Sequence, residues 1–133
     1  MDSSVVLRRL LNAPGRITSW KTWDASCSSA LLEVEVSRAI DRLRLQRALS
    51  DTAVSEAHQD FQILAGGMDL IPVSGAVLRR AAQPFPTSLK TLDALHVASA
   101  LLWQEQVGES LLFLTHDIPQ QTAARALGFR VSL

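Results

Sequence analysis

Apolar and polar positions along the chain follow the pattern of amphipathic helices separated by short apolar strands. The most regular helical pattern covers residues 28–45, with Ser28 or Ser29 as the predicted N-cap. Apolar residues recur there at helical spacing: Leu32, Val36, Ala39, Ile40 and Leu43. Further helices are predicted at 3–11, at 50–64, after a Ser74 cap, and at 92–105.

The C-terminal stretch predicts a parallel β-sheet. Residues 111–114 form an apolar strand, a turn follows at 115–117, and a helix at 119–127 ends at Gly128 before a strand at 129–131. A strand, a helix and a strand within about 20 residues form a right-handed crossover. With a short strand at 70–73, the pattern predicts one α/β domain over residues 1–133.

Composition narrows the class of protein. The apolar fraction of 47% and the charged fraction of 20% are typical of a globular domain and exclude a disordered chain. The longest apolar runs, of four or five residues such as 111–114, are far below the ~20 needed to cross a bilayer. A single Cys27 and an N-terminus without a basic leader predict a reducing, cytoplasmic location.

Acidic residues occur where helices are predicted to begin, at the sheet edge that carries sites in parallel α/β folds. Asp2 precedes the first helix, Asp93 lies in the first turn of another, and Asp117 follows the strand at 111–114. Each alone is typical of a helix cap. A fourth acid comes from the long helix as Glu33 or Glu35, and periodicity leaves both open. Carboxylates gathered so closely require a hard cation, Mg²⁺ or Mn²⁺, which suits hydrolysis of a phosphodiester.

The net charge of zero does not indicate a nucleic-acid binder, but the distribution of charge adds information. With four of the thirteen acids committed to a metal, nine remain against thirteen basic residues. Eleven of the basic residues are Arg, which favours bidentate phosphate contacts, although high genomic GC content gives the same bias. Four arginines are candidates for RNA phosphate contacts, or for an ordinary solvated face: Arg8, Arg9, Arg38 and Arg42.

Aromatic and histidine side chains carry weaker predictions. Trp20 and Trp23, near Lys21, suit stacking on bases, packing of a loop on the core, or docking of a partner. His96 is expected to be a packed histidine rather than a metal ligand, and His116 a solvent-facing turn residue. No His and Cys spacing resembles a zinc site.

Four segments in order carry a family resemblance: 2–7, 32–39, 91–98, and 114–117 with 124–128. Together they resemble the PIN-domain ribonucleases, and specifically the VapC toxins of bacterial VapBC toxin–antitoxin pairs. The family motif, a Val-Glu pair before Arg-Ala, implies Glu35 rather than Glu33 as the second acid. The implied fold is a three-layer α/β/α arrangement around a central parallel sheet. The family places an apolar strand before the first Asp. In this sequence Asp2 follows Met1 directly, so we expect that strand to be missing.

The resemblance also implies a function and roles for individual residues. It implies a divalent-metal-dependent endoribonuclease in which a metal-activated water attacks RNA, with Mg²⁺ or Mn²⁺ as cofactor. The implied catalytic and metal-binding residues are Asp2, Glu35, Asp93 and Asp117, supported by Ser4 and Thr115. The implied partners are a VapB-type antitoxin and a second copy of the chain. The alternative is a non-catalytic PIN-like binding module, inactivated by loss of the first strand.

Overall fold

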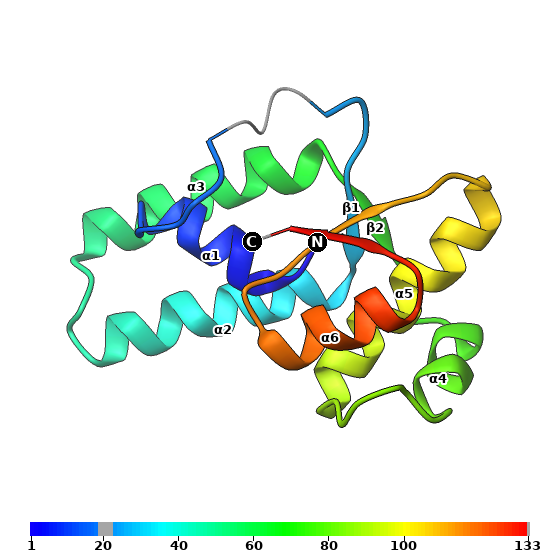
Figure 1. Ribbon diagram of the computed structural model, residues 1–133. Coiled ribbons are helices and arrows are strands. Elements are labelled where there is room, and N and C mark those ends of the chain that lie inside the picture. Colours follow the sequence, from blue (N-terminus) through cyan, green and yellow to red (C-terminus); the bar gives the residue numbers. More distant parts are fainter. Residues whose placement is uncertain (19–22, 133) are drawn as a thin grey trace.

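The computed structural model describes residues 1–18 and 23–132, and it is built from six helices and four strands within those ranges (Figure 1). The elements, in chain order, are α1 (Ser3–Leu10), β1 (Cys27–Ser29), α2 (Leu31–Leu45), α3 (Asp51–Gly66), β2 (Asp69–Ile71), α4 (Gly75–Ala81), α5 (Thr91–Val107), β3 (Leu112–Leu114), α6 (Ile118–Ala126) and β4 (Arg130–Ser132). None of the helices in these ranges has the length and apolar character needed to cross a membrane.

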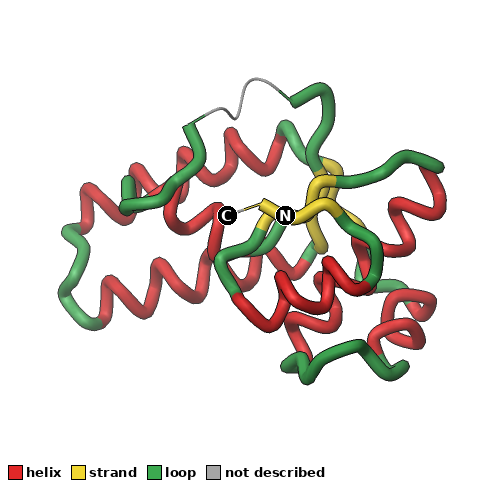
Figure 2. The backbone as a smooth tube through the Cα atoms, in the orientation of Figure 1, coloured by secondary structure: helices red, strands yellow, loops and turns green. Residues whose placement is uncertain are grey.

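The strands form two parallel pairs, β1 with β2 and β3 with β4, in agreement with the predicted parallel sheet. Met1 and Asp2 lie between the pairs, since the Met1 amine donates to Cys27 O at 2.9 Å and Asp2 N donates to Leu114 O at 3.0 Å. Because these two residues separate β1 from β3, the two strands lie about 9.5 Å apart at this level, which is twice the usual strand spacing. Figure 2 shows the strands gathered near the middle of the molecule between two groups of helices.

Helix α5 is the central helix, as its small residues predict. Its residues from Ala94 to Leu101 are all buried, and the helix packs against α4, α6 and β1. On the other side of the strands, α1, α2 and α3 contact one another around a second cluster that includes Val6, Val36 and Ile40. The predicted apolar stripe of 28–45 is thus the buried face of α2.

The start of α2 differs from the prediction. Ser28 and Ser29 belong to β1, and the N-cap position of α2 is Ala30, which has no side-chain cap. The Ser29 hydroxyl still accepts from the N–H of Leu31, the first residue of the helix, at 3.4 Å. The hydroxyl of Ser28 donates instead to Met1 O at 2.6 Å, so it fixes the N-terminal residues. The three small residues of β1 show no alternation of apolar and polar positions, so pairing with β2 decides that they form a strand. The other boundaries lie within three residues of those predicted.

A groove of about 340 Å³ lies between the stretch leading into β1 and strand β3. Its lining includes Met1, Trp23, Cys27 and Phe113 and none of the four predicted catalytic acids. Trp23 therefore lies at this groove and away from the acids, while Trp20 is outside the described residues.

Candidate metal centre

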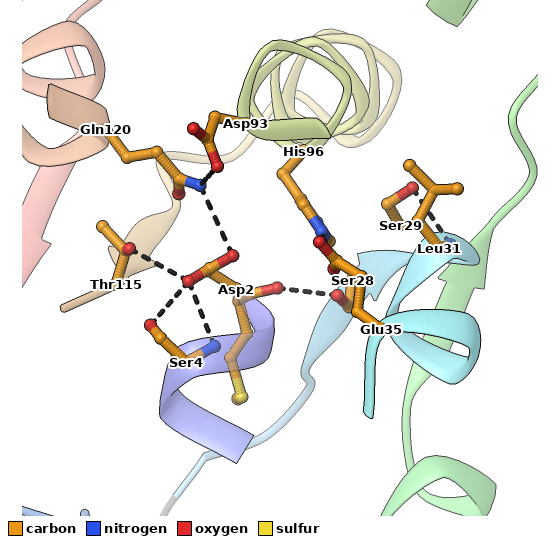
Figure 3. A network of polar contacts seen from close by, with 11 residues as sticks. Asp2, Ser4, Ser28, Ser29, Leu31, Glu35, Asp93, His96, Thr115 and Gln120 are labelled. Carbon is orange, nitrogen blue, oxygen red and sulfur yellow. Dashed lines mark hydrogen bonds and ion pairs between the residues drawn. The ribbon is translucent and has the colours of Figure 1, made fainter. Parts of the chain in front are cut away.

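Asp2 is the most buried of the predicted acids, with 5% of its surface exposed (Figure 3). Its Oδ2 accepts hydrogen bonds from Ser4 N at 3.1 Å, Ser4 Oγ at 2.5 Å and Thr115 Oγ1 at 3.2 Å. The bond from Ser4 N makes Asp2 the N-cap of α1, so the capping role and the site role fall on the same side chain. Ser4 and Thr115 therefore fix the orientation of this carboxylate.

The environment keeps Asp2 ionised despite its burial. Burial alone favours the neutral acid, but hydrogen bonds from Ser4 and Gln120 and the nearby charge of His96 outweigh it, so the pKa of Asp2 is lowered. A buried carboxylate that stays ionised at neutral pH is a strong ligand for a cation.

Glu35 reaches the same region from α2 and meets His96 of α5. Glu35 Oε2 lies 2.5 Å from His96 Nε2, and the His96 side chain is 2% exposed. Glu33 is exposed on the same helix. The structure therefore brings Glu35, and not Glu33, toward Asp2, which periodicity alone left open.

Asp2, Glu35 and His96 form a group suited to a metal ion. One ligand atom from each lies within 4.8 Å of the others, the only such group found among the described residues. Two carboxylate oxygens and an imidazole nitrogen are all common ligands of divalent cations in proteins. His96 is buried as predicted, but its partner is a site carboxylate. Its position three residues after Asp93, on the same face of α5, is the sequence signal for this role.

Asp93 joins the cluster through a side chain that sequence reasoning did not single out. Gln120 of α6 donates from Nε2 to Asp93 Oδ1 at 2.8 Å and to Asp2 Oδ1 at 3.4 Å. Gln120 is 1% exposed, and Figure 3 shows its amide between the two carboxylates. Asp2 and Asp93 are thus held facing each other by one amide group.

Asp117 has a structural role at the beginning of α6. Its Oδ1 accepts a hydrogen bond from Gln120 N at 2.8 Å, and its own N–H donates to Thr115 Oγ1 at 3.0 Å. Asp117 is therefore an N-cap, and it is not among the three residues whose ligand atoms lie within 4.8 Å. It fixes the helix that carries Gln120 into the cluster.

His116 was predicted to face solvent, but in the structure it is half-buried. Its backbone N–H donates to Ser4 Oγ at 3.1 Å, which links the β3–α6 turn to the start of α1. Burial and the nearby Arg8 lower the pKa of the His116 ring. His116 therefore supports the hydroxyl that holds Asp2.

The four predicted RNA-contacting arginines separate into two groups. Arg38 and Arg42 line a groove of about 550 Å³ that also includes Glu35. Arg8 instead donates to Pro14 O at 2.7 Å, and Arg9 lines a different groove, against α3. The structure thus places two of the four arginines in the same groove as Glu35.

The structure is therefore a parallel α/β domain in which Asp2, Glu35 and Asp93, from three separate segments, lie in one acidic cluster. The model of the PIN domain family matches residues 1–121, and the chain belongs to this family. Its three-layer α/β/α fold agrees with the observed layers of helices around parallel strands.

Two curated relatives are ribonucleases of the VapC type. Ribonuclease VapC47 of Mycobacterium tuberculosis (strain CDC 1551 / Oshkosh) is 26% identical over 129 residues, which cover 97% of this chain and 91% of that protein. Ribonuclease VapC46 of Mycobacterium tuberculosis (strain ATCC 25618 / H37Rv) is 37% identical over 97 residues, 72% of this chain and 71% of that protein. No solved structure gives a significant match.

Proposed function

We propose that the chain is a divalent-metal-dependent endoribonuclease, the toxin of a type II toxin–antitoxin pair. The observation that carries the proposal is the ionised, buried Asp2 with Glu35 and His96 ligand atoms within 4.8 Å of it. The VapC-type ribonucleases among its relatives support RNA as the substrate.

Some side chains of the cluster would hold the cation, and others orient the carboxylates. Asp2, Glu35 and Asp93 are the carboxylates that would hold Mg²⁺ or Mn²⁺, while Ser4 and Thr115 orient Asp2 through its Oδ2. When bound, a divalent cation supplies a Lewis acid for a phosphate oxygen and lowers the pKa of water. Asp117, the fourth predicted acid, has a supporting role in this proposal, because it caps the helix that carries Gln120.

The groove beside Glu35 is the proposed path of the RNA backbone. Arg42 is exposed there, and Arg38, with 77% of its side chain exposed, contacts Asp41 at 3.4 Å. An exposed ion pair of this kind contributes little stability, so Arg38 is available for a phosphate. Both guanidinium groups would bring phosphates toward the cluster.

The partners follow from the VapC-type relatives. We propose a VapB-type antitoxin as the inhibitory partner and a second copy of the chain as a dimer partner. A cytoplasmic location stays a prediction from the single Cys27, which is a free thiol.

The test combines Mn²⁺ calorimetry with cleavage of structured RNA and of DNA. The Asp93→Asn variant should lose at least tenfold in Mn²⁺ affinity and lose RNA cleavage. Asp60→Asn, an exposed acid on α3, is the matched control and should keep both. If the unmodified chain binds no Mn²⁺ and leaves RNA intact, the proposal fails and the non-catalytic binding module is favoured. Cleavage of DNA alone would contradict the RNA substrate.

A further inference from the structure

Gln120 occupies a position in the acidic cluster that none of the family motifs in this sequence explains. Its amide nitrogen is within hydrogen-bond distance of two carboxylates, Asp93 at 2.8 Å and Asp2 at 3.4 Å. The NH₂ group carries two hydrogens, so it can serve both acceptors at once. The amide therefore lies between two of the carboxylates that would hold a cation.

The other end of the same amide is unsatisfied. Gln120 is 1% exposed, and its Oε1 has no hydrogen-bond partner in the part of the chain that the structure describes. An unpaired buried acceptor is costly, and each such group in a folded protein calls for an explanation. A side chain needed only to fill this space would be apolar, because it would avoid that cost.

The amide can reverse its ends without moving the rest of the side chain. The last torsion of Gln is broad and roughly two-fold, and its oxygen and nitrogen have nearly the same shape. A turn of about 180° points Oε1 at Asp2 and Asp93 and places Nε2 where Oε1 now lies. In the present orientation the amide donates to two carboxylates, and in the reversed orientation it would present an oxygen toward a cation that those carboxylates hold.

We propose that Gln120 is a residue of the metal site with two orientations. Without metal its NH₂ group holds Asp2 and Asp93 together, and with a divalent cation bound it turns to present Oε1 as a neutral oxygen ligand. The proposal rests on the proposed function, because it concerns the same cation. The proposed role adds an oxygen ligand from α6 to a site whose other residues lie before α1, on α2 and on α5.

The experiment measures Mn²⁺ affinity by calorimetry and the melting temperature of the metal-free protein for three variants. Gln120→Met keeps the length of the side chain but removes both amide functions. Gln120→Glu keeps an oxygen ligand but removes the donor that separates the acids. Gln62→Met, an exposed glutamine on α3, is the matched control.

Gln120→Met should bind Mn²⁺ about tenfold more weakly than the unmodified protein and should melt at a lower temperature without metal. Gln120→Glu should restore Mn²⁺ affinity to at least the original value while its metal-free melting temperature falls further, since three carboxylates then repel one another. Gln62→Met should leave both quantities unchanged. Rescue of metal affinity by the glutamate is not expected of a residue that only supports packing.

Equal or tighter Mn²⁺ binding by Gln120→Met would overturn the proposal, because the amide would then be dispensable or a competitor of the cation. Failure of Gln120→Glu to recover affinity would overturn the ligand role as well. These outcomes leave the proposed function intact as long as the unmodified protein binds Mn²⁺. Absence of Mn²⁺ binding by the unmodified protein would overturn both proposals.

Discussion

Replacing Ser4 by Ala tests whether the hydrogen bonds around Asp2 have the energetic weight that the structure assigns to them. The Ser4 hydroxyl donates to Asp2 Oδ2 at 2.5 Å and accepts from His116 N at 3.1 Å. A hydrogen bond to a charged group contributes about 1.5–3 kcal/mol, and Ala regains roughly 0.5 kcal/mol as the better helix former. The expected loss is therefore about 1–2.5 kcal/mol in the free energy of unfolding, or roughly 4–10 °C in melting temperature.

The pH dependence of this loss separates the bond to Asp2 from general packing. The pKa of Asp2 is lowered in the folded state, so its stabilisation is present above the ordinary pKa of 3.8 and is lost as pH falls through the folded pKa. Because Ser4 contributes to that lowering, the cost of Ser4→Ala should be full at pH 7 and should shrink on acidification below pH 3.8.

The assay is urea unfolding at neutral and acidic pH, with Ser3→Ala in the same first turn of α1 as the control. Ser3→Ala should change the free energy of unfolding by less than about 0.5 kcal/mol. Equal losses in the two variants, or a Ser4→Ala loss that does not vary with pH, would refute the reasoning.

Three further predictions concern other parts of the chain. Burial and the nearby Arg8 lower the pKa of His116, so its contribution to stability is present above the ordinary pKa of 6.5 and is lost as pH falls toward the folded pKa. His116→Asn should therefore reduce the drop in urea midpoint between pH 7.5 and 5.5, and an unchanged drop would contradict this. Gly128→Ala should destabilise by about 1 kcal/mol because φ is +88°, whereas helical Gly66→Ala, with open space around it, should stabilise by about 0.5–1 kcal/mol; similar changes in thermal denaturation would argue against the conformational cause. Arg42→Ala should lower the salt dependence of RNA binding in EDTA by about 0.7 in log–log slope, and an unchanged slope would remove Arg42 from the RNA path.

The local pattern of the chain determined most of its elements. The stripe of Leu32, Val36 and Ile40 predicted α2 because a helix needs one apolar face, and that face is buried in the structure. Ser74 caps α4 as predicted, since its hydroxyl accepts from Val77 N, and Gly128 adopts the positive φ expected after a helix. These features depend on neighbours a few residues away, which a sequence displays directly.

Strand β1 could not be predicted in the same way. Cys27, Ser28 and Ser29 have no apolar alternation, and they become a strand because β2 pairs with them and because Met1 bonds to Cys27 and Ser28. Those partners are separated from β1 by more than twenty residues. Pairing between distant segments, rather than propensity, decides such a strand.

The acidic site also depends partly on local sequence and partly on contacts between distant segments. The sequence by itself determined which acids stand at helix beginnings, and the family motif selected Glu35, but it assigned no role to Gln120 and predicted packing alone for His96. Only the tertiary structure placed α5 and α6 so that His96 meets Glu35 and Gln120 lies between Asp2 and Asp93. The physical reason is that a buried polar side chain takes its role from the partners that satisfy it, and these partners come from four separate segments of the chain.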